Sequence, residues 1–261
     1  MIPEIEVAAA AIMHHSDVVC LTGAGMSVES GIRSFRGPGG LWTEHGEPAL
    51  DDYQRFVHDP KRYWEELIQP EGFIAELHSA LRSAHPHVGH VALAEMERLG
   101  LLAFTITQNI DDLHRQAGSQ RLAEIHGNYS LVRCLQCGRR APVATFNTET
   151  LPPHCSRCGG LLKSDIVVFG EPIPDDVAQT CIDEIDQADC LLMVGTSAYV
   201  YPAAGFPRHV KAHGGTIIEV GPHPTEISGE CDIVVRGTAV EVLPRLLALM
   251  KERLGTTTSN G

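Results

Sequence analysis

The chain has 261 residues, of which 43% are hydrophobic and 20% are charged, an ordinary balance for a globular protein with a sizeable core. Its net charge of −13 argues against nucleic acid and anionic membrane surfaces as partners, because both attract a basic face. The first residues lack the basic region of a signal peptide, and no run of about 18 apolar residues could span a membrane. We therefore expect a cytoplasmic protein of one or two domains.

The first half of the chain combines strands, helices and one long loop. The apolar run Val18–Thr22 stops at Gly23 and predicts a buried parallel strand. Residues 23–46 are rich in Gly and Ser and predict a loop, which at this length is often functional. The other expected elements are helices over 3–15, 61–83 and 87–99 and strands over 102–107 and 122–126.

Strands alternate with helices from residue 165 onward. This alternation predicts an α/β fold, in which right-handed crossovers build a parallel sheet with helices on both faces. Strands are expected over 165–169, 190–195, 216–220 and 232–235, and helices over 175–187, 202–213 and 238–253.

Four of the eight cysteines form the most specific local pattern. They lie in two Cys-x2-Cys pairs at the spacing of a zinc ribbon: Cys134, Cys137, Cys155 and Cys158. Because four thiolates complete a tetrahedral shell, the predicted zinc is structural and has no open position for catalysis. Redox pairs are the alternative, but they do not need two pairs at this spacing.

The segment Gly23–Ser27, with the sequence GAGMS, directly follows the first predicted strand. Its small residues let backbone N–H groups approach a phosphate, although a generic glycine turn explains the segment as well. It does not match GxGxxG, and the chain about twenty positions later is still within the loop, so no acidic residue supplies the usual ribose contact. An ordinary nicotinamide dehydrogenase is therefore disfavoured.

Two further polar signals follow predicted strands. Gln108–Asp111 follows the strand over 102–107, and ligands collect at the carboxyl edge of a parallel sheet. Asn109 and Asp111 suit an amide or a ribose, but a helix cap explains them as well. His126 ends another strand; its imidazole suits general-base work at neutral pH, while a lone histidine is more often structural.

Six segments occur in a recognisable order along the chain. They are GAGMSVESGIRSFRG (23–37), TQNIDDLH (107–114), HG (126–127), the four cysteines, VVFGE (167–171) and GTS (195–197). In this order they closely resemble the sirtuins, a family of NAD-dependent protein-lysine deacylases, and the resemblance covers residues 17–248. Each motif alone could arise by chance, but six in one order are specific. They favour the functional interpretation of Gly23–Gly25, Asn109, Asp111 and His126.

The resemblance implies a Rossmann-like NAD-binding domain and a small domain, with NAD and substrate meeting in the cleft between them. The small domain would combine the cofactor loop, a helical insertion and the zinc ribbon. The Rossmann-like domain would comprise residues 1–30, 84–127 and 165–261, and the small domain residues 31–83 and 128–164.

The resemblance also implies the roles of individual residues. The acyl oxygen would attack C1′ of the nicotinamide ribose as nicotinamide leaves, and His126 would then deprotonate the ribose hydroxyls. Asn109, the second catalytic residue, would hold the nicotinamide ribose. A substrate segment would pair through its backbone with an extended acyl-lysine peptide: Val168, Phe169, Gly170 and Glu171. The residues implied to bind NAD are Gly23, Ala24, Gly25, Ser27, Phe35, Arg36, Gln108, Asn109, Ile110, Asp111, Gly195, Thr196, Ser197, Gly221 and Ala239.

Two departures from the family pattern bear on specificity. Gly221 stands where many relatives have an Asn that contacts the adenosine ribose. Leu67 and Pro70 stand where relatives that prefer succinyl or malonyl lysine have Tyr and Arg. We therefore expect apolar acyl chains, from acetyl upward.

Three other functions remain open on the sequence. The leading alternative is a mono-ADP-ribosyltransferase, which would cleave NAD in the same way but pass ADP-ribose to a protein. An NAD-sensing module with a dead site is disfavoured by the intact Gln108, Asn109, Asp111 and His126. A zinc-ribbon nucleic-acid binder is disfavoured by the negative charge. The expected partners are acyl-lysine proteins or peptides and NAD, with no nucleic acid and no membrane, and the expected state is a monomer.

Overall fold

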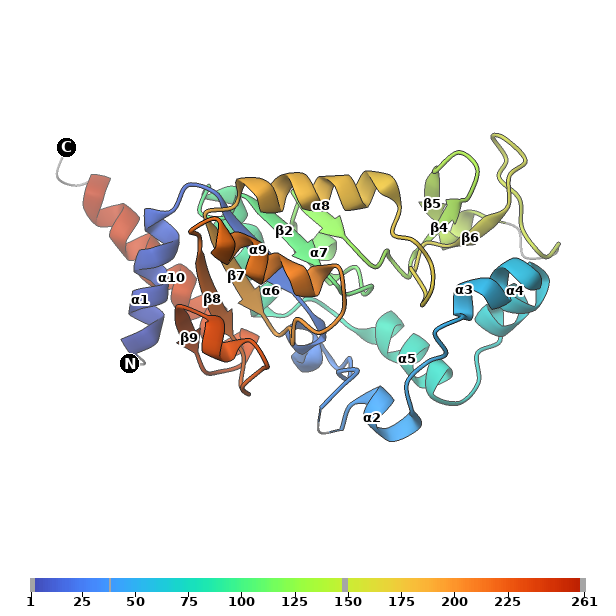
Figure 1. The fold of residues 1–261 in the computed structure, drawn as a ribbon, viewed down its shortest axis with the longest axis horizontal. Helices are drawn as coiled ribbons and strands as arrows, with labels where there is room; N and C mark the ends of the chain where they lie inside the picture. Colours follow the sequence, from blue (N-terminus) through green and yellow to red (C-terminus); the bar gives the residue numbers. More distant parts are fainter. Residues whose placement is uncertain (1–2, 38, 147–149, 259–261) are drawn as a thin grey trace.

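The computed structural model describes residues 3–37, 39–146 and 150–258, and its larger part is a parallel sheet of six strands (Figure 1). The strand order is β3-β2-β1-β7-β8-β9, and every pairing is parallel. The strands are β1 (Val18–Thr22), β2 (Phe104–Thr107), β3 (Leu122–Glu124), β7 (Cys190–Val194), β8 (Thr216–Val220) and β9 (Ile233–Val235). The predicted α/β fold with a Rossmann-like sheet is confirmed.

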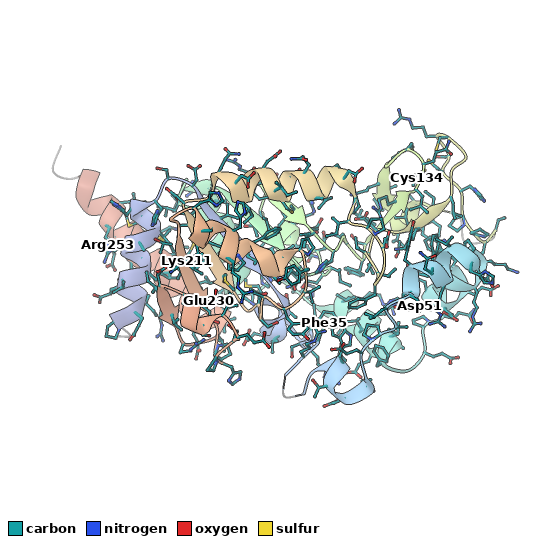
Figure 2. All side chains as sticks on the ribbon, in the orientation of Figure 1. Phe35, Asp51, Cys134, Lys211, Glu230 and Arg253 are labelled. Atoms are coloured by element: carbon teal, nitrogen blue, oxygen red, sulfur yellow. The ribbon has the colours of Figure 1, made fainter. Side chains whose placement is uncertain are left out.

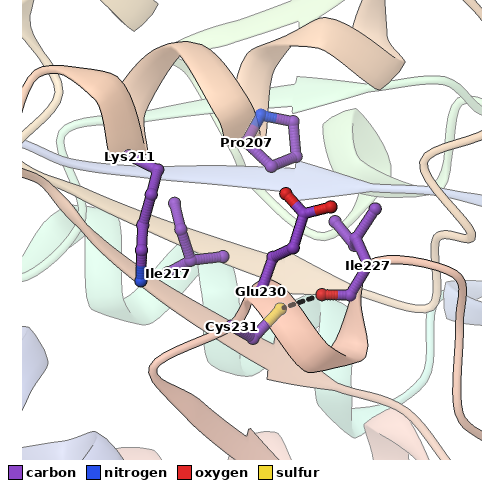
Figure 3. Close-up of a pocket in the computed structure, with 6 residues that line it drawn as sticks. All are labelled: Pro207, Lys211, Ile217, Ile227, Glu230 and Cys231. Atoms are coloured by element: carbon purple, nitrogen blue, oxygen red, sulfur yellow. Dashed lines mark hydrogen bonds between the residues drawn. The ribbon is translucent and has the colours of Figure 1, made fainter.

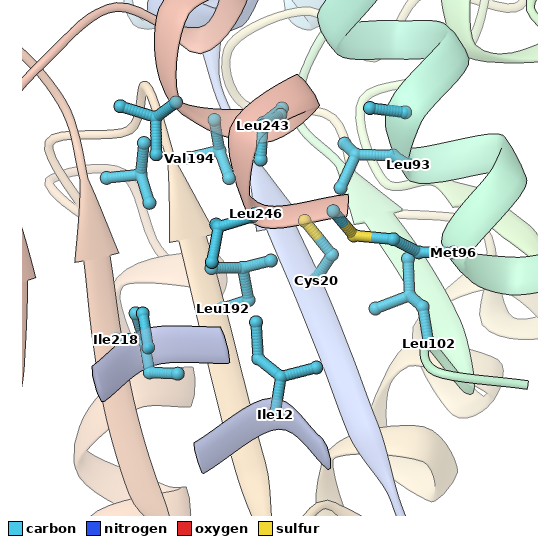
Figure 4. Close-up of a cluster of buried hydrophobic side chains, with 14 of the residues drawn as sticks. Ile12, Cys20, Leu93, Met96, Leu102, Leu192, Val194, Ile218, Leu243 and Leu246 are labelled. Atoms are coloured by element: carbon cyan, nitrogen blue, oxygen red, sulfur yellow. The ribbon is translucent and has the colours of Figure 1, made fainter. Parts of the chain in front are cut away.

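Helices cover both faces of this sheet. On one face lie α1 (Pro3–His14), α6 (Val88–Arg98) and α10 (Ala239–Thr258), and on the other α8 (Asp175–Gln187) and α9 (Phe206–Ala212). Side chains of β1 alternate between the faces: Cys20 packs near Leu192 and Leu246 in one cluster (Figure 4), and Leu21 lies in the other. Because both faces are covered, an uninterrupted apolar run can form this strand.

A smaller antiparallel sheet and a group of helices form the other end of the molecule (Figure 1). Its strands are β4 (Leu131–Cys134), β5 (Arg140–Pro142) and β6 (Leu162–Ser164), and the helices are α2 (Leu41–His45), α3 (Asp52–His58), α4 (Pro60–Ile68) and α5 (Gly72–Ser83). Trp64 of α4 is fully buried against Val132 and Leu162, and its Nε1 donates to the Leu162 carbonyl at 3.0 Å. The helical insertion and the ribbon therefore share one core. The domain boundaries drawn from the sequence stay a prediction.

Two predicted elements differ most clearly from the structure. The strand expected over 165–169 is absent: β6 ends at Ser164, and residues 165–170 form bends and a turn. The apolar run had indicated a strand, but here the Lys163 ammonium bonds to the Ile166 carbonyl and the Glu171 carboxylate to the Val168 N–H. The helix expected over 61–83 is two helices, because Pro70 lacks an N–H and restricts the residue before it.

The long loop predicted over 23–46 contains short helical pieces, and its Pro38 lies outside the described residues. The remaining short elements are α7 (Leu113–Gln116) and the 3-10 turns η1 (Ala24–Met26), η2 (Val28–Ser30), η3 (Val143–Thr145), η4 (Ala203–Gly205) and η5 (Ser228–Glu230). Within the described residues, each helix is too short or too polar to cross a membrane.

Candidate functional site

The site lies where the strand order of the large sheet reverses. From β1 the chain builds outward to β2 and β3, and from the adjacent β7 it builds the opposite way to β8 and β9. Ligands of open α/β sheets bind in the crevice at such a switch point, beyond the carboxyl ends of the strands. The segments Gly23–Ser27 and Gly195–Ser197 follow these two central strands. The predicted NAD-binding glycines are thus at the expected edge.

The two glycine segments approach so closely that they exclude side chains. Gly25 N–H donates to the Gly195 carbonyl at 2.8 Å, and a Cβ on Gly25 would lie 2.8 Å from the Gly195 Cα. Gly195 also has a φ of +59°, which favours glycine. Only bare backbone therefore fits between β1 and β7 at this edge.

Asn109, Ser27 and Asp111 form a buried polar network beside Gly23. The Asn109 Nδ2 group donates to the Gly23 carbonyl at 3.0 Å and to Ser27 Oγ at 3.1 Å, and Ser27 Oγ donates to Asp111 Oδ2 at 2.6 Å. Burial raises the pKa of Asp111, while the Ser27 hydrogen bond opposes that rise. Since both Asn109 amide hydrogens have partners, its Oδ1 is the group that can accept from a sugar hydroxyl.

His126 lies beside this network and bonds to Gln108, which directly precedes Asn109 in the chain. Its Nδ1 lies 3.0 Å from the Gln108 carbonyl, and Gln108 Nε2 donates to Thr196 Oγ1 at 2.7 Å. A carbonyl only accepts, so in the neutral ring the proton resides on Nδ1 and Nε2 presents its lone pair. Burial lowers the pKa of His126, which keeps the imidazole neutral and able to act as a base.

A second, deeper histidine supports Asn109 from behind, and sequence reasoning did not single it out. His114 Nε2 lies 3.0 Å from Thr22 Oγ1, which donates to Thr107 Oγ1, and the Asn109 N–H donates to the same Thr107 oxygen at 3.1 Å. Burial lowers the pKa of His114 to about 4. A neutral, fully buried ring thus fixes the backbone that carries Asn109; its only sequence signal is its place in the motif TQNIDDLH.

Aromatic rings join the cofactor loop to the substrate segment. Phe35 and Trp42 have ring centroids 4.7 Å apart, and Trp42 lies 5.6 Å from Phe169. The Arg36 guanidinium lies over the rings of Trp42 and Tyr199, and it pairs with Glu47 at 2.9 Å. The role of Arg36 toward phosphate stays a prediction; in this structure its partners belong to the chain itself.

The substrate segment begins directly beside His126. The Val167 N–H donates to the His126 carbonyl at 2.8 Å. Gly127, with a φ of +76°, permits this approach, since a Cβ there would lie 1.9 Å from the Asp165 carbonyl oxygen. The Phe169 carbonyl accepts from the Tyr53 N–H at 3.0 Å. The predicted base and the predicted peptide-pairing backbone are therefore neighbours.

The four predicted metal ligands converge at the far end from Lys211 and Arg253, as the label of Cys134 shows in Figure 2. Their sulfur atoms all lie within 4.8 Å of one another, with Cys134–Cys158 at 3.5 Å and Cys137–Cys155 at 3.9 Å. Zn–S bonds near 2.3 Å in a tetrahedron place sulfurs roughly 3.8 Å apart. The cluster fits zinc, and four thiolates leave no position for a substrate.

Comparison with known proteins identifies the family. Residues 23–202 match the model of the Sir2 family. The chain is 40% identical to NAD-dependent protein deacylase 2 of Pyrobaculum aerophilum (91% of this chain, 92% of that protein) and 42% identical to the NAD-dependent protein deacylase of Thermococcus kodakarensis (90% and 91%). The chain belongs to the Sir2 family.

Solved structures of Sir2 proteins agree with this assignment. A Sir2 homologue in complex with NAD superposes with a TM-score of 0.79 at 39% identity, covering 95% of this chain and 94% of that one. A Sir2 mutant with a deacetylated p53 peptide and 3′-O-acetyl ADP ribose gives 0.77 at 29% identity, covering 94% and 97%. The predicted sirtuin resemblance is confirmed.

Three further positions from the sequence analysis can now be placed. The Gly221 N–H donates to the Val235 carbonyl at 3.2 Å, and a Cβ on Gly221 would meet no described atom within 4 Å. Ala239 is buried at the start of α10. Leu67 packs against the shared core around Trp64. There is thus open space at Gly221 for a side chain.

A small hollow between α9, β8 and η5 is separate from this Sir2 site. Figure 3 shows its lining, in which the Cys231 thiol donates to the Ile227 carbonyl. The lining contains none of the residues predicted to bind NAD, peptide or metal.

Proposed function

We propose that this chain removes acyl groups from protein lysines by transferring them to the ADP-ribose part of NAD, with His126 as the general base. The chain is an enzyme of the NAD-dependent protein deacylase type, as its family and its relatives at about 40% identity indicate. The observation that carries the residue roles is the placement of His126, Gln108 and Asn109 together at the switch point of the sheet, with His126 bonded to Gln108 and Asn109 bonded to Gly23.

Each part of the network has a distinct task in this reaction. Asn109 and Asp111 hold the nicotinamide ribose and the carboxamide through buried polar groups whose orientation Ser27 fixes. An amide oxygen is a weak nucleophile, so holding the acyl-lysine against C1′ supplies much of the rate. His126, neutral and oriented by Gln108, then accepts a ribose hydroxyl proton on Nε2, which lets the 2′ oxygen attack the acyl carbon.

Different parts of the chain hold NAD, the zinc ion and the acyl group. Backbone at Gly23–Gly25 and Gly195–Ser197 faces the phosphates and adenosine of NAD, with Phe35 covering the reacting ribose. The zinc held by the four cysteines supplies structure to the ribbon. The Leu67 side chain, in place of a Tyr, favours apolar acyl groups. We further propose a cytoplasmic monomer that acts on acyl-lysine proteins and binds neither nucleic acid nor membranes, consistent with a net charge of −13.

The test is a panel of acetyl, propionyl, succinyl and long-chain acyl-lysine peptides with and without NAD. We expect NAD-dependent release of nicotinamide, free lysine peptide and O-acyl-ADP-ribose in equal amounts. Mono-ADP-ribosyl transfer would instead appear as an ADP-ribose mass increase on an acceptor protein. Nicotinamide release that depends on an acceptor protein and leaves the acyl peptide intact would overturn the deacylase proposal.

A further inference from the structure

A buried cluster of charges lies where the ribbon meets the substrate segment. Arg133 of β4 and Lys163 of β6 both pair with the carboxylate of Glu171, with Lys163 Nζ at 2.8 Å from Oε2. The side chains are 9%, 0% and 2% exposed, respectively. Lysine and glutamate are almost never fully buried without a partner, so this arrangement needs a reason.

All hydrogen bonds of the Lys163 ammonium group are made within this cluster. Its three ammonium hydrogens are matched by the carbonyls of Ser164 (3.2 Å) and Ile166 (2.6 Å) and by Glu171. Burial lowers the pKa of Lys163, and the Glu171 carboxylate opposes that change. Arg133 also faces Asp165 at 3.6 Å. The cations are thus anchored to the ribbon strands and to the chain that leads into the substrate segment.

The carboxylate of Glu171 in turn shapes the substrate segment. Glu171 Oε2 accepts from the Val168 N–H at 3.1 Å, and the Glu171 N–H donates to the Val168 carbonyl at 3.0 Å. The turn is therefore closed in both directions by one residue. Gly170, at φ +78°, supplies the left-handed step within it. These contacts also explain why no strand forms over 165–169.

We propose that Glu171 is a positioning residue for the acyl-lysine peptide. Its carboxylate, fixed by Lys163 and Arg133, holds the Val168–Gly170 backbone in the shape that pairs with the peptide. The Glu171 side chain thus acts from its buried position, without itself contacting the substrate. This inference rests on the proposed function, because the peptide is the substrate that the segment would bind.

The hydrogen bonds of Glu171 indicate why a neutral side chain should not hold the turn. In Glu171→Gln, the amide oxygen can accept from Val168 or face the cations, but the amide NH2 must then point at a donor. Glu171→Asp keeps the charge for Lys163 and Arg133, yet its shorter side chain cannot also reach Val168. Both variants should loosen the turn while leaving the NAD side intact.

The experiment measures kcat and KM for an acetyl-lysine peptide, KM for NAD, and the unfolding midpoint of each variant. For Glu171→Gln and Glu171→Asp we expect the peptide KM to rise about tenfold, as for a lost hydrogen bond to a charged group, with kcat and the NAD KM unchanged. The matched control is Asp176→Asn. It removes an exposed ion pair with Arg140 at 2.8 Å, at the edge of the same cluster, where Arg140 also pairs with Asp165. It should leave the peptide KM unchanged.

A double variant separates positioning from stability. Glu171→Gln with Lys163→Met neutralises both members of the Lys163–Glu171 pair and leaves Arg133 with Asp165, so the unfolding midpoint should recover in part relative to Glu171→Gln alone. The peptide KM should stay raised. Recovery of the KM together with the midpoint would overturn the proposal, as would an unchanged KM in both single variants. If Glu171→Gln does not fold, Glu171→Asp decides.

The failure of the proposed function would give a different result. A wild type that binds the peptide without deacylating it would overturn the deacylase role alone. Peptide dissociation constants from fluorescence anisotropy, compared between wild type and Glu171→Asp, would then decide on Glu171: a weakened complex supports the positioning role and an equal one contradicts it.

Discussion

The two sheets of this protein are stabilised by different means. The six-stranded sheet lies between two extensive clusters of buried apolar side chains, so both of its faces are sealed by helices. The three-stranded sheet has a small cluster around Trp64, in which two of the buried members are the metal-ligand residues Cys134 and Cys155. Next to it lie the charges of Arg133, Lys163 and Glu171. A sheet with few apolar contacts depends on metal and ion pairs.

The difference separates two parts of the proposed chemistry. Asn109 and His126 stand at the edge of the sheet that burial holds rigid, where small shifts would disturb catalysis. The substrate segment is held by the part that metal and charge maintain. Perturbing the metal or the buried charges should therefore affect peptide binding, and perturbing the large core should affect the stability of the large sheet.

Removing zinc should have the largest effect and act on the small sheet alone. Structural zinc sites contribute about 10–16 kcal/mol of apparent binding free energy in zinc-finger peptides, more than a cluster of this size can replace. Chelation, or Cys155→Ala, should abolish amide protection in β4 and β6 while β1 and β7 stay protected in hydrogen exchange. Protection over 131–134 that survives in metal-free protein would contradict this difference between the sheets.

Truncating the large core should give the opposite pattern. Leu192→Ala removes a fully buried side chain between α10 and α1, and should lower the free energy of unfolding by about 2–5 kcal/mol. Zinc content should stay unchanged. The control Val7→Ala, at an exposed site on α1, should change stability by less than about 0.5 kcal/mol. A loss of zinc in Leu192→Ala would show that the two sheets are not independent.

Acid should weaken the large sheet through its buried histidines. Burial lowers the pKa of His114 to about 4 and that of His90 to about 2. Both stay neutral in the fold, whereas in the unfolded chain they take up protons below about 6.5. The unfolded state then binds more protons, so the free energy of unfolding should fall as the pH drops below about 6.5 and continue to fall toward pH 4. His114→Gln should flatten this slope in denaturant titrations; an unchanged slope would be inconsistent with a buried neutral ring.

The smallest effect is expected at Gly221. The open space there should admit an Asn without loss of stability. Gly221→Asn should tighten NAD binding by about fivefold, the worth of one added hydrogen bond. Calorimetric titration with NAD measures this directly. Equal affinities would mean that the adenosine ribose lies elsewhere.

The sequence predicted the strands of the large sheet best, because each of them is a recognisable apolar run. The runs at β1, β7 and β8 were predicted to within a residue, because strands buried on both faces are continuously apolar. The short strands of the small sheet were not resolved, since β4 and β6 each include a buried cation, Arg133 or Lys163, whose partner Glu171 comes from another segment. A periodicity cannot show such pairing.

At the candidate site, too, the sequence predicted the residues within motifs but not the contacts that hold them. The order of the glycine, Gln108–Asp111 and His126 motifs predicted the residues that the switch point brings together, because each motif follows a strand of the same parallel sheet. The supporting roles of two motif residues were missed: His114 acts through Thr22 on another strand, and the Glu171 carboxylate closes a turn onto Val168, and their motifs do not show these bonds.

The central claim, that His126 is the base of the acyl-transfer step, is tested most directly by comparing two reactions of His126→Ala. Exchange of labelled nicotinamide into NAD needs only attack of the acyl oxygen on C1′, while deacylation also needs a base. The account predicts that exchange persists while deacylation falls by about 10²–10⁴-fold. Wild-type deacylation by His126→Ala, or equal loss of both reactions in a folded variant, would contradict it.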